Sequence, residues 1–498
     1  MPRLSAPLNS FLCFLTLGLL FVLGCKKSDS LTPTEEQDNS LIFESFVFEN
    51  KNNAFLDKDL TFEIKENIIS GPLKHYNYTA IPTFRTNAQS VEINGAQQTS
   101  GRTPVDFRKG VIYTLRSTTG GTRNFTLRIS WDNKLPQFNI STDGRVAINS
   151  KTDFVPTTIT IDGQTRFPDF EGTALIRGRG NTTWGFPKKP YKFKLDTDAE
   201  ILGLAAEKDW ILLSNYLDGT HLLNAVGMKI GQLLDMPYTN NIIPVEVTLN
   251  GDYLGAYMLT EQIEVKKNRV NVGKDGLLLN LDTNFDEPYQ FQSKSYQLPV
   301  TIKYPKEIDS QTFTAIKNDF ENLEALVASP DFPNNNYLDF FDGDAFANYL
   351  IVYMLTGNEE INHPKSTYIH KTKTGKYTMG PVWDFDWAFA FEGSLQHFSS
   401  FDTPLFWTPP RRGTNFFSKF LEDPEIIALV KANWTTFQAN ELPELLRYID
   451  EYTFLIQGAR NRDFVEWAQG NSNFNVEVAN VKNWLSDRAR YMLSLIHI

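Results

Sequence analysis

The sequence predicts a multidomain protein in which an all-β N-terminal sandwich precedes an α+β domain with a mainly helical C-terminal part. Short segments with alternating apolar residues fill residues 41–132 and are separated by turn signals such as Asn94-Gly95. Apolar residues at helical spacing appear later and dominate residues 424–492. Since strands come first and helices follow, the order favours an α+β fold over an alternating α/β fold. The length of 498 residues also exceeds that of one small domain.

The first residues predict an export signal. A single arginine precedes an apolar run over residues 11–23, which is too short for a comfortable membrane span. The run ends at Cys25 in a pattern that resembles a bacterial lipobox, and the resemblance implies cleavage before Cys25 and lipidation of that residue. An ordinary signal peptide with a chance cysteine is the alternative. We therefore expect a signal peptide over residues 1–24 and a polar, flexible stalk over residues 25–40.

The expected lipidation restricts where the protein is located, and the composition restricts the class of partner that it can bind. Lipidation would anchor the protein in the cell envelope, at the outer membrane or cell surface, and outside the cytoplasm. The net charge of −11 argues against nucleic-acid binding, which depends on a basic surface. The only cysteines are Cys13 and Cys25, so the mature chain would have no disulfide and no cysteine-based zinc site. Heptad repeats are lacking, and we expect a monomer.

The strands of the N-terminal region are expected at 42–48, 60–64, 90–93, 111–115 and 125–131. Strands at this spacing predict a small β-sandwich over residues 41–132. The region also resembles the Ig-like modules at the N-terminus of Bacteroidetes surface lipoproteins, on residues 91–95, 98–101 and 106–107. It contains no constellation of catalytic side chains, so we expect a role in spacing or adhesion.

The second domain is expected over residues 133–492. Its first part contains further strands, followed by a helix at 222–234 and a hairpin at 244–260 around Asn250-Gly251. Helices at 313–327 and 345–355 come next, then a second hairpin at 367–382 and the helical region.

A basic loop is the most informative motif of the chain. Residues 176–184 combine glycines and threonines and run into the lysine-rich residues 188–195. Glycine lets a backbone approach a ligand and expose its N–H groups, and lysine supplies a point charge for phosphate. The pattern is neither the P-loop nor the dinucleotide motif. It fits polyphosphate binding, and it also fits a tight turn followed by a solvated basic strand.

An acidic pair, Asp384 and Asp386, is the second motif. In an extended strand the two carboxylates would share one face, with the aromatic residues 383, 385 and 387 on the other. Adjacent carboxylates repel one another, and a divalent cation such as Mg²⁺, Mn²⁺ or Ca²⁺ would offset this cost. Alternatively, one aspartate is solvated and the other caps the following helix.

The chain from about residue 135 to 488 resembles the CotH kinase family. The resemblance lies in several segments in the same order: 177–184 (RGRGNTTW), 188–195 (KKPYKFKL), 208–216 (KDWILLSNY), 249–255 (LNGDYLG), 259–265 (LTEQIEV), 268–270 (NRV) and 380–389 (GPVWDFDWAF). It implies an atypical protein-kinase-like fold that uses ATP and a divalent metal ion to phosphorylate serine or threonine on proteins. The acceptor could also be another exported molecule with a hydroxyl group.

The resemblance also implies roles for individual residues. Asp384 and Asp386 match the metal ligands, and Lys192 or Lys194 matches the lysine that contacts phosphate. Glu261 would anchor that lysine or line the nucleotide pocket, although a surface strand residue is an equal alternative. The candidate nucleotide-binding residues are Arg177, Arg179, Asn181, Thr182, Thr183, Lys189, Lys192, Lys194 and Glu261.

The sequence departs from the family at the expected catalytic base. Active members carry an Asn-x-Asp motif upstream of the acidic pair, and here Glu360 occupies the position of that aspartate. The longer side chain moves the carboxylate, and an error of about 1 Å can cost on the order of a hundredfold in rate. Glu360 is therefore the candidate base, with His363 as a substitute or as a turn residue. A pseudokinase or binding lipoprotein, and a repurposed adhesion or glycan-handling protein, are the alternatives to a kinase.

The last segment, residues 493–498, resembles the translation of a sequencing adapter. We therefore expect it not to belong to the natural protein, and its histidine receives no functional interpretation.

Overall fold

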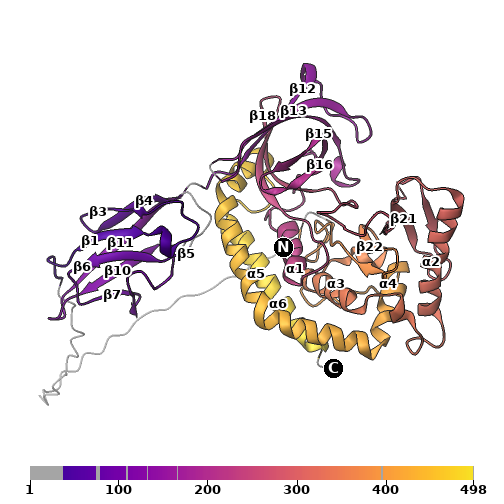
Figure 1. Cartoon of the computed structure of the whole chain (residues 1–498). Coiled ribbons are helices and arrows are strands. Elements are labelled where there is room, and N and C mark those ends of the chain that lie inside the picture. The colour runs from indigo at the N-terminus through magenta and orange to yellow at the C-terminus, as the bar shows by residue number, and fades with distance from the viewer. Residues whose placement is uncertain are drawn as a thin grey trace, which may run out of the picture.

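The computed structural model describes residues 37–73, 79–107, 110–131, 133–164, 166–285, 287–393 and 396–496. The predicted signal peptide, Cys25 and most of the predicted stalk lie outside these residues. Figure 1 shows three parts: a strand-rich N-terminal region, a β-barrel, and a mixed lobe bordered by two long helices. No helix among the described residues combines the length and apolar character that a membrane span requires.

Two sheets with a common apolar core form the N-terminal region. One sheet has the order β2 (Leu60–Thr61), β1 (Phe43–Phe48), β6 (Pro82–Thr86); the other has the order β3 (Glu63–Lys65), β4 (Ile68–Leu73), β11 (Thr122–Trp131), β10 (Val111–Arg116), β7 (Ser90–Ile93), β8 (Ala96–Gln97). A short pair, β5 (Thr79–Ala80) and β9 (Val105–Asp106), accompanies them. Phe46 of the first sheet packs edge-on against Tyr113 of the second, with ring centroids 5.4 Å apart.

The strand-rich character predicted for this region is confirmed. Four of the five expected strands appear, one of them with the expected ends, whereas the strand expected at 60–64 is divided into β2 and β3, which belong to different sheets. The sequence missed β4 and β6, whose prolines and glycine weaken the strand pattern. β4 pairs in parallel with β11, while the other pairings of the sheet are antiparallel. The Ig-like assignment remains a prediction.

A closed seven-stranded barrel follows, which the sequence did not predict. Its strand order is β12 (Gln137–Thr142), β13 (Val155–Asp162), β14 (Phe170–Gly178), β15 (Tyr191–Ile201), β16 (Leu204–Leu213), β18 (Asp252–Glu261), β17 (Ile243–Leu249). The parallel pairing of β17 with β12 closes it. Side chains alternate along β15, so Phe193 packs in the interior core with Trp210, whereas Lys192 and Lys194 point away from that core.

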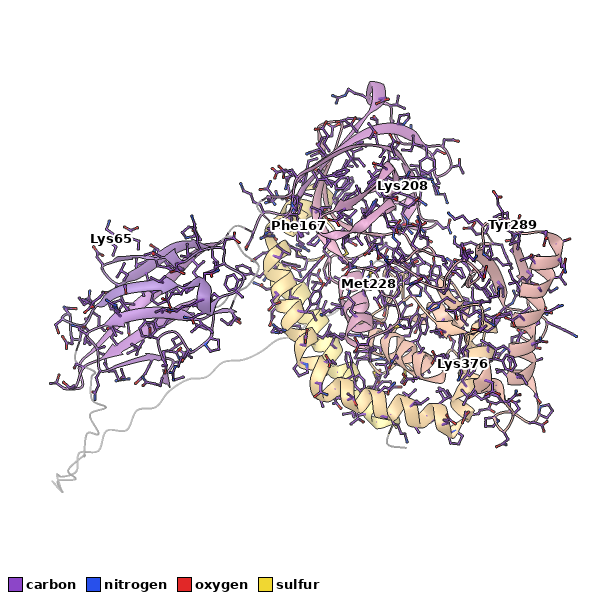
Figure 2. All side chains as sticks on the ribbon, in the orientation of Figure 1. Lys65, Phe167, Lys208, Met228, Tyr289 and Lys376 are labelled. Carbon is purple, nitrogen blue, oxygen red and sulfur yellow. The ribbon has the colours of Figure 1, made fainter. Side chains whose placement is uncertain are left out.

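The mixed lobe combines a five-stranded antiparallel sheet with six helices. The sheet order is β20 (Gln290–Gln292), β21 (Pro299–Tyr304), β19 (Leu277–Leu281), β22 (Thr367–Lys371), β23 (Thr378–Met379). The helices are α1 (Leu223–Leu233), α2 (Ser310–Ala328), α3 (Gly343–Thr356), α4 (Arg412–Phe417), α5 (Pro424–Trp467) and α6 (Phe474–Ile496). They share one core, in which Met228 of α1, labelled in Figure 2, is only 1% exposed.

Helix α5 connects the two parts of the second domain. It is 44 residues long, contains Pro443, and contacts β18 of the barrel as well as α1, α3 and α6 of the lobe. Figure 1 shows it extending from the barrel along the edge of the lobe. The predicted helical region is therefore two long helices. The second continues through residues 493–496 of the suspected adapter segment, and residues 497–498 lie outside the described part.

The acidic segment is not the extended strand that the sequence predicted. Residues 381–385 have no regular structure, and residues 386–390 form turns. Asp384 has a φ of 64°, a left-handed conformation in which the simple alternation of a strand does not apply. Trp383 and Trp387 consequently lie beside the two aspartates on the wall of one cavity, while Phe385 is buried in the core.

Candidate active site

A cavity of about 660 Å³ lies between the barrel and the mixed lobe. Its walls come from the loop between β14 and β15, from β19, and from the segment that follows β23. The predicted residues that line it are Arg177, Arg179, Asn181, Thr182, Thr183, Lys192, Glu360, Asp384 and Asp386. The fold thus brings the basic loop and the acidic pair to the same cavity, although they are distant in the sequence.

Glycines allow the basic loop to fold tightly. A Cβ atom on Gly178 would lie 2.2 Å from the ring of Trp184, so no larger residue fits where this ring packs. Gly180 has a φ of 81°, which L-residues rarely adopt. A short 3-10 helix over Thr183–Gly185 then leads toward β15. The loop therefore presents Arg179 and Asn181 to the cavity close to the backbone of the barrel.

Helix α1 holds the acidic pair through Asn224. The Asn224 amide donates a 2.7 Å hydrogen bond to Oδ1 of Asp386, and its carbonyl accepts a 3.1 Å bond from the backbone N–H of Phe385. Asp384 accepts a 3.1 Å bond from the Ser366 hydroxyl. The side chain of Asn358 donates to the backbone carbonyl of Asp384 at 3.1 Å. Neighbouring elements thus fix both carboxylates.

The electrostatics of the pair favour binding of a cation. Burial raises the pKa of both carboxylates, and the charge of Asp384 adds to this effect at Asp386, whose pKa rises to about 7. The nearby Arg179 guanidinium works in the opposite direction and favours the charged forms. A bound cation would relieve the remaining repulsion.

Cationic side chains surround the acidic pair. The guanidinium of Arg179 lies over the Trp383 ring at 5.6 Å, and the ammonium group of Lys365 lies over the Trp387 ring at 5.0 Å. Lys192 forms a 2.9 Å ion pair with Asp209. Burial lowers the pKa of Lys192, and the Asp209 carboxylate opposes that shift. The cavity therefore offers positive charge for phosphate next to carboxylates for a metal ion.

Glu360 lies at the edge of this cavity and is 5% exposed. Among the described residues, its Oε2 atom has no hydrogen-bond partner. Burial raises its pKa well above the ordinary value, and the Asp384 carboxylate contributes to the rise. The Asn358 side chain accepts a 3.1 Å bond from the Glu360 backbone N–H and caps the 3-10 helix Glu359–Asn362. Glu360 therefore brings a carboxylate with one buried, unpaired oxygen to the wall of the cavity.

Three predicted residues lie away from the cavity. Lys189 donates to the Trp184 carbonyl at 2.8 Å and lines a different cavity on the barrel. Lys194 is exposed on the barrel surface. Glu261 accepts bonds from the backbone and side chain of Asn241, at 2.8 and 2.6 Å. The ionic partner of Lys192 is Asp209 and not Glu261. Lys192 lies opposite Ile211 in the register of β15 and β16, so it reaches Asp209 diagonally across the strand pair.

The sequence did not predict several other residues that line the cavity. They are Lys151, Asn224, Asn280, Asp282, Lys303, Lys365 and Ser366. Lys151 donates to the Asn181 side chain at 3.0 Å and so reaches the basic loop. The carbonyl oxygen of the Asn280 side chain is buried and lacks a hydrogen-bond partner in the described part of the chain. Asn224 had one sequence signal, because a polar side chain inside an apolar helix usually has a specific partner.

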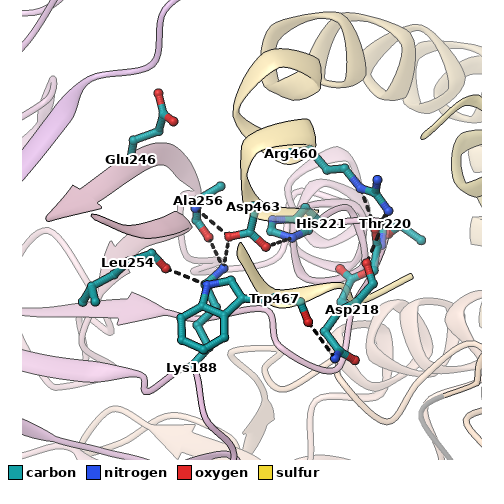
Figure 3. A network of polar contacts seen from close by, with 12 residues as sticks. Lys188, Asp218, Thr220, His221, Glu246, Leu254, Ala256, Arg460, Asp463 and Trp467 are labelled. Atoms are coloured by element: carbon teal, nitrogen blue, oxygen red, sulfur yellow. Dashed lines mark hydrogen bonds and ion pairs between the residues drawn. The ribbon is translucent and has the colours of Figure 1, made fainter. Parts of the chain in front are cut away.

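A buried polar network connects the basic loop to helix α5. Figure 3 shows Asp463 of α5 between Lys188 and His221. Lys188 is completely buried and donates to Asp463 at 2.5 Å and to the Ala256 carbonyl at 2.6 Å. His221 contacts the second oxygen of Asp463 at 3.1 Å. Burial opposes ionisation of Asp463, but the charges of His221 and Lys188 outweigh it and lower its pKa to about 2.

The same network reaches the start of helix α1. Asp218 accepts hydrogen bonds from the backbone N–H groups of Thr220 and Leu223, at 2.8 and 2.9 Å, and so caps that end of the helix. Arg460 of α5 donates to the Gly219 carbonyl at 3.0 and 3.1 Å. Helix α5 therefore holds both the segment that follows the basic loop and the helix that carries Asn224.

The donor set fits a magnesium ion bound together with a nucleotide. Among the described ranges, no group of three or more His, Cys, Asp or Glu side chains has the geometry of a metal site. Mg²⁺ commonly uses one or two carboxylates and completes its shell with phosphate oxygens and water. Asp384 and Asp386 could supply those carboxylates, and the adjacent cations could bind the phosphates.

Comparison with known proteins assigns the family. The family described as CotH kinase protein matches residues 176–492, which is more than half of the chain. The match begins in β14, ends in α6 and includes the basic loop, Glu360 and the acidic pair. A comparison with curated proteins found no match. The family indicates a kinase-like function, and the chain belongs to the CotH kinase family.

Proposed function

We propose that this protein is a metal-dependent kinase that transfers the γ-phosphoryl group of ATP to serine or threonine hydroxyls of a protein. One observation carries the proposal: two half-buried carboxylates, Asp384 and Asp386, share a cavity with the basic loop. Phosphoryl transfer requires positioning and charge stabilisation more than covalent chemistry, and this arrangement offers both. The family match supports the same reaction class.

The cations would hold the triphosphate. Arg179 lies near both aspartates and can pair with two phosphate oxygens at once, because its guanidinium is planar. Lys192 and Lys151 approach from the barrel and Lys365 from the lobe. ATP bound in this way would span the junction of the two parts and place its γ-phosphate near the acidic pair.

Asp384 and Asp386 would hold Mg²⁺, or Mn²⁺ or Ca²⁺ in its place. A divalent ion at this position neutralises charge on the transferring phosphoryl group. Asn224 orients Asp386, and Ser366 orients Asp384, so neither carboxylate must reorganise when the ion binds.

Glu360 would act as the base toward the acceptor hydroxyl. The bond between the γ-phosphorus and its bridging oxygen breaks, a bond to the acceptor oxygen forms, ADP leaves, and Glu360 takes the proton. Glu360 can accept a proton only when ionised, and burial opposes its ionisation. The charge of Lys365 favours the ionised form.

The proposal also includes the cellular location of the protein. The pattern that ends at Cys25 supports a lipid anchor in the cell envelope, with the strand-rich region as an Ig-like spacer between the membrane and the kinase domain. The acceptor would then be a protein, or another hydroxyl-bearing molecule, that is itself exported.

Transfer from γ-labelled ATP to a mixture of serine-containing polypeptides tests the proposal. Asp384→Asn should reduce the Mg²⁺-dependent transfer about a hundredfold or more. Asp331→Asn is the matched control, because Asp331 is exposed on the same lobe and lines none of the cavities described above. Equal transfer by the wild type and Asp384→Asn would refute the assignment of the acidic pair.

A pseudokinase is the second candidate, and Glu360 is the observation that favours it. A glutamate where active family members carry aspartate extends the carboxylate by one methylene group. This candidate predicts nucleotide binding without transfer, whereas the kinase predicts both.

A further inference from the structure

A second chamber of about 590 Å³ adjoins the nucleotide cavity. Thr182, Glu360 and Trp387 line both spaces, so the proposed base lies at their junction. The remaining wall is largely aromatic and comes from segments that are distant in the sequence; it includes Phe186, Leu217, His363, Phe391 and Trp407. If an acceptor molecule placed its hydroxyl at Glu360, another group of that molecule could occupy this chamber and would lie next to the hydroxyl.

The chamber favours an uncharged, apolar occupant. Its described lining contains no lysine or arginine. Burial and the nearby Lys365 and Arg411 lower the pKa of His363 to about 4, which leaves the ring neutral at neutral pH. Glu359 accepts a 2.8 Å hydrogen bond from the indole N–H of Trp407, so its carboxylate already has a partner. Lys365 and Arg411 act on His363 from outside this lining, so the described walls themselves carry no counter-charge for an anionic ligand.

The ring arrangement suits one flat or branched side chain. Trp387 stacks on Phe391 with centroids 6.0 Å apart, and His363 lies against Trp407 at 5.4 Å. Apolar groups packed against such rings gain both burial and aromatic contact. A sugar would need several hydrogen-bond partners for its hydroxyls, whereas most of the described lining is apolar or aromatic.

We propose that this chamber binds an apolar or aromatic side chain of the acceptor polypeptide, directly beside the residue whose hydroxyl is phosphorylated. The inference rests on the proposed function, because it takes Glu360 as the base and the larger cavity as the nucleotide site. It adds a specificity that the family match does not contain: the acceptor is a polypeptide with a hydrophobic neighbour at its hydroxyl residue.

The test is selection from a displayed peptide library. Peptides with a fixed central serine and random flanking positions are bound to the protein in the presence of Mg²⁺ and a non-hydrolysable ATP analogue, and the bound pool is sequenced. We expect enrichment of Phe, Tyr, Trp, Leu or Met over Gly, Asp and Glu at a position adjacent to serine, by roughly tenfold or more.

Two variants of Trp407 and one control variant test whether the peptide selection takes place in this chamber. Trp407→Ala removes one wall and should abolish the enrichment, whereas Trp407→Phe keeps an apolar wall and should retain most of it. Phe340→Ala removes an aromatic ring that is 37% exposed and lines none of the cavities described above, so it should leave the enrichment unchanged. The same samples are titrated with ATP and Mg²⁺ in a thermal-shift measurement.

The outcomes are distinguishable. An unselected bound pool, or a selection that Trp407→Ala retains, overturns the inference while nucleotide binding still supports the proposed function. Binding to a glycan array with no peptide selection overturns it in favour of a carbohydrate acceptor. If ATP and Mg²⁺ produce no thermal shift in the wild type, the proposed function itself is refuted.

Discussion

Asp386 carries an electrostatic cost in the candidate site. Its pKa is about 7 in the folded chain against an ordinary 3.8, because of burial and the neighbouring Asp384 carboxylate. A raised pKa means that the folded state binds the proton more tightly. The stability that this proton supplies is present below pH 3.8 and is lost as the pH rises to about 7.

Asp386→Asn should therefore stabilise the metal-free protein at pH 7 to 8. The amide oxygen can still accept the hydrogen bond from Asn224, while the repulsion with Asp384 disappears. We expect a gain of about 1–3 kcal/mol, or a few degrees in Tm, that shrinks toward pH 4. Thermal unfolding in a chelator across this pH range measures it. A loss of stability at pH 8 would contradict the repulsion described here.

Glu360 should set the acid limit of phosphoryl transfer. Since its pKa is raised well above 4.5, the ionised base forms only as the pH rises through that higher value. The rate should consequently climb at a pH well above the ordinary range for glutamate. Glu360→Gln should lose transfer yet bind ATP, and Glu360→Asp should retain transfer. An acid limb near pH 4.5, or full activity in Glu360→Gln, would exclude Glu360 as the base.

At the level of elements, helix α1 connects the packing of the lobe to the acidic pair. Asn224 makes this connection, and most of the rest of the helix is apolar and buried, apart from the half-buried polar residues Lys229 and Gln232. Asn224→Ala should weaken Mg²⁺-dependent ATP binding by about 10- to 100-fold, the usual effect of removing a residue that orients a metal ligand. Gln232→Ala in the same helix is the control, and calorimetric titration is the measurement. Equal affinities in both variants would show that Asp386 needs no such support.

Helix α5 stabilises the junction through Asp463. Asp463→Asn would leave the Lys188 charge buried without its partner, which should cost about 3–5 kcal/mol. The double change Lys188→Met with Asp463→Leu should cost less than Asp463→Asn, because no charge is then stranded. Chemical denaturation measures both. If Asp463→Asn were as stable as the wild type, the network in Figure 3 would contribute little to the free energy of unfolding.

The pH dependence of this network has the opposite sign to that of Asp386. The pKa of Asp463 is lowered to about 2 from an ordinary 3.8. Its contribution is therefore present above pH 3.8 and disappears as the pH falls through about 2, and it amounts to about 2 kcal/mol.

At the level of the whole molecule, the sequence predicted features that depend on neighbouring residues. The hairpin at Asn250-Gly251 appears as a two-residue turn with φ values of 55° and 92°, as this dipeptide favours. Side chains alternate along β15, so Lys192 and Lys194 face away from Phe193, as the periodicity of a strand requires. The long apolar repeats predicted α1, α3 and the helical C-terminal region.

Local sequence patterns could not predict contacts between residues that are distant in the sequence. Barrel closure depends on β12 pairing with β17, and the support of the acidic pair depends on Asn224, 162 residues before Asp386. Lys188 meets Asp463 across 275 residues. The acidic segment misled the prediction because its alternating aromatic residues imitate a strand, whereas Asp384 adopts a left-handed turn.

Calorimetric titration of the protein with ATP, with and without Mg²⁺, tests the central claim most directly. We expect binding that requires Mg²⁺, is lost in Asp384→Asn, and is unchanged in the exposed-carboxylate control Asp331→Asn. Binding that is indifferent to both Mg²⁺ and Asp384, or no binding at all by the wild type, would contradict the claim that the cavity between the barrel and the lobe is a metal–nucleotide site.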